Sequence, residues 1–210
     1  MTADARTEVL RRIRTALADA PPPAPAPVPA VPPAAMSDVA ARFAERVADY
    51  RATVTRCHAG DQAIAAAVQA AFARHGAAVV VVAPGVPVAW RPDGTVVDDP
   101  PFSVEALDAV DGVLTGAALG IAETGTIVLD GAALSGRRAI TLVPDLHVCV
   151  VAATDLVGDV PEAFERLAPA IGEGRPITFV SGPSATSDIE LDRVEGVHGP
   201  RRLEVIVVEC

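Results

Sequence analysis

The stretch "AAVVVVA", residues 77–83, is apolar throughout, and it decides the fold class. An unbroken apolar run of this length predicts a buried strand, and Pro84-Gly85 ends it. An Ala-rich helical pattern runs from Asp61 to about His75 just before it, and Gly76 separates the two. A helix that leads directly into a buried strand indicates an α/β arrangement.

The same alternation continues on both sides of this unit. Ahead of it we expect a helix from Ser37 or Asp38 to about Tyr50 and a strand at 53–57. Behind it we expect a short helix near 103–108, a strand at 111–117, a helix at 160–171, and strands at 176–182 and 203–209. Strands that alternate with helices predict a mainly parallel sheet flanked by helices.

The pattern changes in the middle of the chain. Four short apolar stretches follow one another there: "ALGIAE" (118–123), "GTIVLD" (125–130), "RAITLVP" (138–144) and "HVCVVA" (147–152). Small loops join them, as is typical of a meander. We therefore expect a small antiparallel insertion in the α/β fold.

The N-terminal residues 1–19 form an amphipathic helical pattern in which Val9, Ile13 and Leu17 are spaced by four. Such a helix packs on its own domain or docks on a partner. The narrow apolar stripe and the acidic residues argue against a membrane-surface helix. Residues 20–36 are Pro-rich and predict an extended, stiff linker, which leaves 37–210 as the main domain.

Composition argues against several classes of function. The 210 residues carry a net charge of −10, which argues against a nucleic-acid surface. No apolar run approaches the roughly 18 residues of a membrane span, and no secretory signal is visible, so we expect a cytoplasmic protein. Every basic side chain other than histidine is Arg, which excludes a lysine Schiff base and a P-loop lysine.

The three cysteines are Cys57, Cys149 and Cys210, and no C-x-x-C pair exists. This spacing argues against an iron–sulfur cluster or a structural zinc site in this chain. We therefore expect no cofactor here. Cys149 lies in an apolar stretch and is expected to be inert core.

The stretch "GIAETGTIVLD", residues 120–130, places Glu123 among apolar neighbours. An ionised carboxylate there is costly unless it is paired or hydrogen-bonded, and Gly125 permits a close backbone approach. One hypothesis makes Glu123 a catalytic carboxylate facing a cleft, with Thr124, Gly125 and Thr126 binding the ligand. The alternative is a fold-fixing glutamate held by Thr hydroxyls, backbone amides or an Arg.

A second stretch, "SGPSATSDIELDR" at 181–193, follows a strand, the usual position of a ligand loop in an open α/β sheet. Ser187 and Glu190 have the spacing of a capping box, and a helix start lined with hydroxyls is an anion site. The ligand-binding candidates are Gly182, Ser184, Thr186, Ser187, Asp188 and Glu190. The alternative is an ordinary capped turn.

A third stretch, "GVHGPRR" at 196–202, contains His198 and Arg201. His198 is a candidate base, ligand or anion contact, or else a hydrogen-bonded structural histidine. Arg201 is a candidate partner for a phosphate or a carboxylate. Asp188, Glu190 and His198 have no compact ligand spacing, so no metal site is predicted.

Four segments together resemble the LUD-domain proteins, specifically the lactate-utilization protein C branch. They are "EVLRRIRTAL" (8–17), "GIAETGTIVLD" (120–130), "GPSATSDIE" (182–190) and "GVHGPRRLEVIVVE" (196–209). The resemblance implies a fold like that of the NagB/RpiA/CoA-transferase group, in which the Glu-Thr-Gly turn lines the ligand cleft. It also implies a role in oxidising L-lactate to pyruvate beside iron–sulfur partner proteins, which would hold the clusters.

Three functions stay open from the sequence. The chain is a subunit or accessory factor of a lactate-oxidising complex, a stand-alone enzyme acting on a small molecule such as an acyl-CoA or a phosphorylated sugar, or a binding module without catalysis. In the second case Glu123 would be the nucleophile or base. In every case we expect the loops around Glu123, Ser184 and His198 to converge on one cleft.

Overall fold

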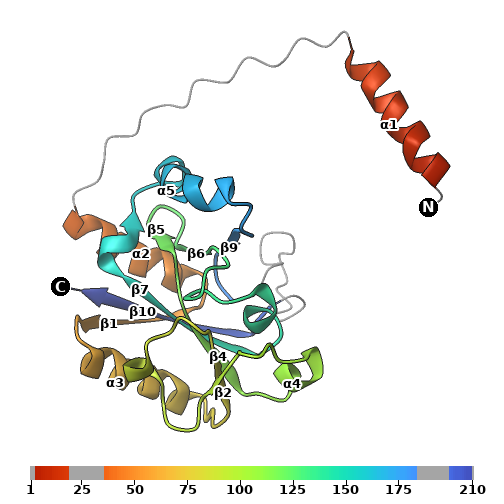
Figure 1. The fold of residues 1–210 in the computed structure, drawn as a ribbon. Helices are drawn as coiled ribbons and strands as arrows, with labels where there is room; N and C mark the ends of the chain where they lie inside the picture. The colour runs from red at the N-terminus through yellow and green to blue at the C-terminus, as the bar shows by residue number, and fades with distance from the viewer. Residues whose placement is uncertain (1–2, 19–35, 184–198, 210) are drawn as a thin grey trace. The chain divides into compact units, whose positions relative to one another are not determined.

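The computed structural model describes residues 3–18, 36–183 and 199–209. The chain divides into two compact units, 1–30 and 31–210, and each is considered by itself. The first unit contains α1 (Ala3–Leu17), which confirms the predicted helix (Figure 1). Its apolar side chains Val9, Ile13 and Leu17 are about half exposed, at 50%, 48% and 62%. The Pro-rich stretch lies outside the described residues, so its extended conformation stays a prediction.

The larger unit contains two sheets (Figure 1). The main sheet is parallel throughout, in the order β1 (Thr53–His58), β10 (Arg202–Glu209), β7 (Leu146–Ala152), β4 (Gly112–Gly116), β2 (Val80–Val82), β3 (Val96–Val97). The small sheet has the order β8 (Leu156–Val157), β5 (Leu119–Ile121), β6 (Thr126–Leu129), β9 (Thr178–Val180). Within it, β6 is antiparallel to both of its neighbours.

The α-helices of this unit are α2 (Met36–Asp49), α3 (Asp61–Arg74), α4 (Val104–Asp108) and α5 (Val160–Gly172). Three short 3-10 helices are η1 (Val88–Trp90), η2 (Arg138–Thr141) and η3 (Ala153–Asp155). Local chemistry sets where α4 and α5 begin, because Ser103 and Asp159 accept backbone hydrogen bonds as N-caps. In the described part of the chain, we find no helix with the length and apolarity needed to cross a bilayer.

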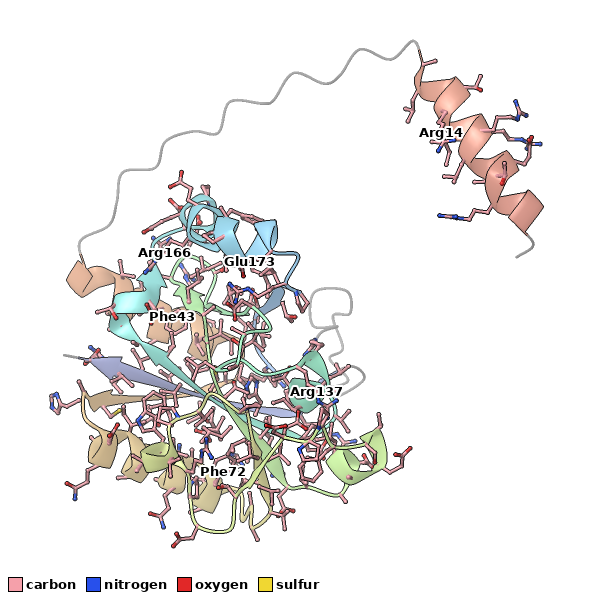
Figure 2. The ribbon with its side chains drawn as sticks, in the orientation of Figure 1. Arg14, Phe43, Phe72, Arg137, Arg166 and Glu173 are labelled. Atoms are coloured by element: carbon pink, nitrogen blue, oxygen red, sulfur yellow. The ribbon has the colours of Figure 1, made fainter. Side chains whose placement is uncertain are left out.

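The core lies on both faces of the main sheet. Phe72 of α3 packs in the cluster on one face, and Phe43 of α2 packs in the cluster on the other (Figure 2). The central strands β4 and β7 are buried along nearly their whole length, and β10 is buried from Leu203 to Val207. Strands buried on both faces are typical of parallel sheets covered by helices. The predicted α/β class, with a mainly parallel sheet and a small insertion, is confirmed.

Three element predictions were wrong. "RAITLVP" is not a strand, because Arg138 and Thr141 hydrogen-bond to each other and close the turn of η2. "HVCVVA" is β7, which lies in the main sheet between β4 and β10 and not in the insertion. The strand at 178–180 does not extend the parallel sheet either. It pairs antiparallel with β6 at the edge of the small sheet.

Candidate functional site

Glu123 lies in the tight turn that joins β5 to β6, at the strand break that the sequence suggested. Its side chain is exposed, and its backbone N–H donates to the Gly158 carbonyl at 3.1 Å. Within the described residues, no group donates a hydrogen bond to its carboxylate. The turn therefore presents a carboxylate to solvent, and the fold-fixing alternative finds no support among these residues.

Gly125 fits this turn against α2. It has a φ of +63°, in the left-handed region that favours glycine. A Cβ at this position would stand 2.5 Å from the Arg46 carbonyl carbon and 2.6 Å from the Val47 nitrogen. These are backbone atoms of a helix and cannot move aside easily. Gly125 is required by packing, whatever its contact with a ligand.

Three hydroxyl groups form a chain beside Glu123. The Thr124 and Thr126 Oγ1 atoms are 2.7 Å apart, and Thr126 Oγ1 is 2.7 Å from Ser181 Oγ. Thr126 lies opposite Ser181 because the neighbouring pair is Ile127 with Val180. Each hydroxyl has one donor and two acceptor sites, so the chain retains capacity for a further group.

This chain of hydroxyls joins two of the predicted stretches. Thr124 and Thr126 come from the first, and Ser181 begins the second. Ser181 was not among the predicted ligand-binding residues. The side-chain period of two along paired antiparallel strands could have suggested it, but only once β6 and β9 were known to pair.

The described ends of the second and third stretches also meet. Gly182 has a φ of +86°, and a Cβ there would stand 2.7 Å from Tyr50 Cβ. A Cβ at Gly199 would lie 3.7 Å from the Pro183 carbonyl oxygen. Ser184, Thr186, Ser187, Asp188, Glu190 and His198 lie outside the described residues. Convergence of Glu123, Ser184 and His198 on one cleft therefore stays a prediction.

Arg201 borders a polar hollow of about 360 Å³ at the amino-terminal edge of the main sheet. The hollow is lined by His75, Asp108, Val110, Asp111, Val143, Asp145, Leu146, Arg201 and Arg202. Arg201 Nη1 lies 3.0 Å from Asp145 Oδ2, and both side chains are exposed. The lining contains three aspartates and two arginines. The net charge of these side chains therefore does not favour binding of an anion.

Two titratable side chains of this lining, Asp111 and His75, make hydrogen bonds within the fold. The Asp111 carboxylate accepts hydrogen bonds from the Val79 and Ala78 N–H groups, which lower its pKa. His75 Nε2 lies 2.7 Å from an oxygen of Glu204, which is 1% exposed.

Glu204 is a buried acid that sequence reasoning missed. Arg74 Nη2 donates to its second oxygen at 2.6 Å, so both carboxylate oxygens have partners. The only signal was a charged residue inside the apolar run "LEVIVVE". A buried carboxylate with partners on both oxygens is a structural group, because its charge would be costly in the core without them.

A second buried polar group lies on β7. His147 Nε2 is 2.8 Å from Thr115 Oγ1, and burial followed by the nearby Arg138 charge lowers its pKa to about 3. His147 is therefore neutral at physiological pH. Burial raises the pKa of Cys149 to about 12, so its thiol stays protonated. A buried thiol is a poor nucleophile and metal ligand, in agreement with the core role predicted for Cys149.

Residues 131–136 cover the carboxyl-terminal ends of β2 and β4 in the main sheet. Gly85 N–H donates to the Ala133 carbonyl at 2.8 Å, and Gly116 N–H donates to the Leu134 carbonyl at 3.0 Å. A Cβ at either glycine would stand 2.6 Å from atoms of this segment. Open α/β sheets usually bind ligands at this edge. Here the chain itself occupies that position beside β2 and β4.

The parallel main sheet and the small mixed sheet define an α/β protein. The comparisons with known proteins agree with this class and give the family. The LUD domain matches residues 102–208, and the chain belongs to this family. It is 47% identical over 209 residues to "Lactate utilization protein C" of Deinococcus radiodurans, covering 99% of this chain and 97% of that protein.

Further relatives match over a shorter length. "Lactate utilization protein C" of Shouchella clausii is 34% identical over 110 residues, which is 51% of this chain and 48% of that protein. Among solved structures, the crystal structure of a DUF162 family protein from D. radiodurans superposes with a TM-score of 0.71. The two chains are 40% identical, and the match covers 84% of this chain and 99% of the other.

Proposed function

We propose that this chain is a cytoplasmic subunit or accessory protein of a system that oxidises L-lactate to pyruvate beside iron–sulfur partner proteins. One observation carries the proposal: the 47% identity to a lactate utilization protein C extends over 97% of that protein. A likeness over nearly the full length includes the N-terminal helix as well as the LUD domain. It therefore supports a shared role and not only a shared fold.

The redox chemistry supports partner proteins. Conversion of a secondary alcohol to a ketone releases two electrons and two protons, which an acceptor must take up. The residues of this chain do not favour a cluster site, since Cys57 and Cys149 lie far apart in sequence and the Cys149 thiol stays protonated. Iron–sulfur clusters in partner proteins would supply the electron path.

The N-terminal helix supports contact with such partners. Val9, Ile13 and Leu17 form an exposed apolar stripe on α1. Exposed apolar helix faces commonly enter grooves on partner proteins. Glu8 pairs with both Arg11 and Arg12 at 2.7 and 2.8 Å, which stabilises the helix without using this stripe.

For the ligand we propose a small anion held at the turn of β5 and β6. Glu123 would act on or beside it, and Thr124, Thr126 and Ser181 would supply hydroxyl groups. The remaining contacts would come from Gly125, Gly182, Ser184, Thr186, Ser187, Asp188, Glu190, His198 and Arg201. The three linked hydroxyl groups, which keep hydrogen-bonding capacity for a further group, support this location.

A second candidate function is a stand-alone small-molecule enzyme that uses Glu123. The exposure of this carboxylate favours it. Residues 131–136 occupy the carboxyl-terminal ends of β2 and β4, which counts against an acyl-CoA or sugar phosphate at that position. Turnover of a thioester or sugar phosphate by the purified chain alone would favour this candidate over the first.

Gene deletion tests the proposal. A strain that lacks this chain should fail to grow on L-lactate and should grow normally on pyruvate, because only the oxidation step is lost. The full-length gene should restore growth. A form that lacks residues 1–18 tests the role of α1, and it should restore growth less well. Equal growth of the deletion strain on both carbon sources would refute the proposal.

A further inference from the structure

Two neighbouring arginines, Arg137 and Arg138, are used differently by the fold. Arg137, which Figure 2 labels, donates through Nε and Nη2 to the two oxygens of Asp98, at 2.6 and 2.9 Å. Arg138 donates through Nη1 to the Oγ1 and the carbonyl oxygen of Thr141, at 2.9 and 3.3 Å. Within the described residues, no acceptor lies on its Nε or Nη2. The contact with Thr141 therefore positions the guanidinium and leaves three N–H groups for another acceptor.

The Nε–Nη2 edge is the part of the guanidinium with which this chain binds carboxylates. Arg11 holds the two oxygens of Glu8 through this edge. Arg74 holds the two oxygens of Glu204 in the same way. The planar edge matches the two oxygens of a carboxylate, which makes such pairs strong and specific. Arg138 presents the same edge without a carboxylate from the described residues.

The charge of Arg138 is not neutralised within the described part of the chain. Hydrogen bonds to carboxylates raise the pKa of Arg74 and of Arg137, whereas burial lowers the pKa of Arg138. The guanidinium nevertheless stays charged, because an arginine pKa lies far above physiological pH. A partly desolvated cation without a counter-ion is unfavourable, and a bound anion would relieve this cost. The side chain still reaches solvent, so an anion can approach it.

Arg138 lines a small hollow between η2 and one end of the small sheet. Leu129 and Thr178, which are paired where β6 ends and β9 begins, line it from the sheet. Its volume is about 10 Å³, which is room for one water-sized atom. Arg138 is the only charged side chain among the described residues of this lining. The hollow thus offers an anion one positive charge and no competing carboxylate.

A buried polar atom lies in the same interior region. His147 shares one face of β7 with Cys149 and Val151, because side chains alternate along a strand. These two residues pack in the cluster that contains Leu129, which lines the hollow. His147 Nδ1 is buried and has no hydrogen-bond partner in the described residues. Since buried polar atoms are nearly always paired, this atom indicates that the region holds a further hydrogen-bonding group.

We propose that Arg138 binds the carboxylate of a small monocarboxylic acid through its Nε–Nη2 edge. One carboxylate oxygen enters the hollow beside Thr178, and the rest of the acid extends toward solvent. One guanidinium matches a single negative charge, whereas a phosphate dianion would leave one charge without a partner. The site lies at the opposite end of β6 from the Glu123 turn, so it is separate from the anion site proposed there.

Thermal unfolding of the full-length protein with added sodium propionate, pyruvate, chloride or phosphate, at equal ionic strength, tests the site. Propionate and pyruvate should raise the melting temperature of the wild type, because a ligand of the folded chain stabilises it. Arg138→Gln should fold, since Gln can still donate to Thr141. Its dissociation constant for propionate should be about tenfold higher, because the charged hydrogen bonds are lost. Arg42→Gln, the same charge change at an exposed position of α2, should respond like the wild type.

Arg138→Lys separates the planar edge from the charge alone. It keeps the charge but loses the edge, so it should lose most of the response to propionate as well. In proton–nitrogen correlation spectra, the Nε–H signal that is absent from Arg138→Gln should shift when pyruvate is added to the wild type.

Four outcomes would overturn the proposal. They are a wild type that does not respond to propionate or pyruvate, a full response in Arg138→Gln or Arg138→Lys, an Arg138 signal that pyruvate does not shift, and stabilisation by chloride or phosphate that equals or exceeds that by propionate.

Discussion

Gly125 and Arg46 approach so closely that a Cβ on the glycine would stand 2.5 Å from the Arg46 carbonyl carbon. This contact sets the position of the Glu-Thr-Gly turn on α2. Gly125→Ala should therefore destabilise the protein by about 2–4 kcal/mol, from the strain of a positive φ and from overpacking against a helix backbone. Thermal or urea unfolding measures the loss.

Gly174→Ala is the control for Gly125→Ala. Gly174 has a similar φ of +73°, but a Cβ there would have no atom within 4 Å. Only the backbone strain applies, so the cost should be about 1 kcal/mol. If both variants lose the same stability, the contact with α2 does not hold the turn in place.

The chain of hydroxyls should contribute to stability through its middle member. Thr126 is 3% exposed, and Thr126→Val keeps its shape but removes the group that joins Thr124 to Ser181. We expect a loss of about 1–2 kcal/mol in unfolding free energy. Thr154→Val, at an exposed position, should change it by less than about 0.5 kcal/mol. An unaffected Thr126→Val would show that the hydroxyls are not coupled.

Glu123→Gln separates a functional from a structural role. The carboxylate is exposed, and within the described residues no group donates a hydrogen bond to it, so the melting temperature should stay within about 2 °C of wild type. Growth on L-lactate should nevertheless be impaired, because the charge is lost. Glu105→Gln, another exposed glutamate, should grow normally. Normal growth of Glu123→Gln would remove Glu123 from the site.

The elements that sequence predicted correctly are those whose signal is local. The run at 77–83 is apolar on every residue, and the helix that begins at Asp61 has a continuous Ala-rich pattern, so neighbouring residues alone define both. "RAITLVP" has the composition of a strand, yet side-chain hydrogen bonds between Arg138 and Thr141 make it helical. The strand propensity of these seven residues does not reveal such side-chain hydrogen bonds.

Pairing between distant segments accounts for the other failures. β7 lies in the main sheet because β4 and β10 flank it, and β10 is about 50 residues further along the chain. Its unbroken buried pattern was the available signal, but such a run fits either sheet. His75 and Glu204 are 129 residues apart in the sequence, so the spacing of neighbouring residues could not predict their contact. For the site, the turn at Glu123 was found from sequence, whereas its link to Ser181 depends on strand pairing.

Asp98 should make the protein sensitive to acid. Its side chain is 2% exposed and lies 2.6 Å from Arg137 Nε. Burial alone would raise its pKa, but the hydrogen bonds from Arg137 and from the Phe102 N–H outweigh burial and lower the pKa below the ordinary 3.8. A lowered folded pKa gives stability that is present above the unfolded value and is lost as the pH falls below it.

Melting temperatures across pH test this assignment. Asp98→Asn should cost about 2–4 kcal/mol at neutral pH, because Arg137 loses its buried partner but is itself about one-third exposed. The variant should also lose less stability than wild type between neutral pH and pH values below the ordinary 3.8. Parallel curves for the two proteins would mean that another carboxyl controls the acid transition.

The proposed role in lactate oxidation is tested most directly on the complex isolated through this chain. The tagged full-length protein, purified anaerobically from cells grown on L-lactate, should carry partner proteins, iron and sulfide, and should convert L-lactate to pyruvate with an added electron acceptor. The same chain purified alone from a host that lacks the partners should contain no iron and show no conversion. Lactate conversion by the chain alone, or an isolated complex with neither iron nor lactate activity, would contradict the account.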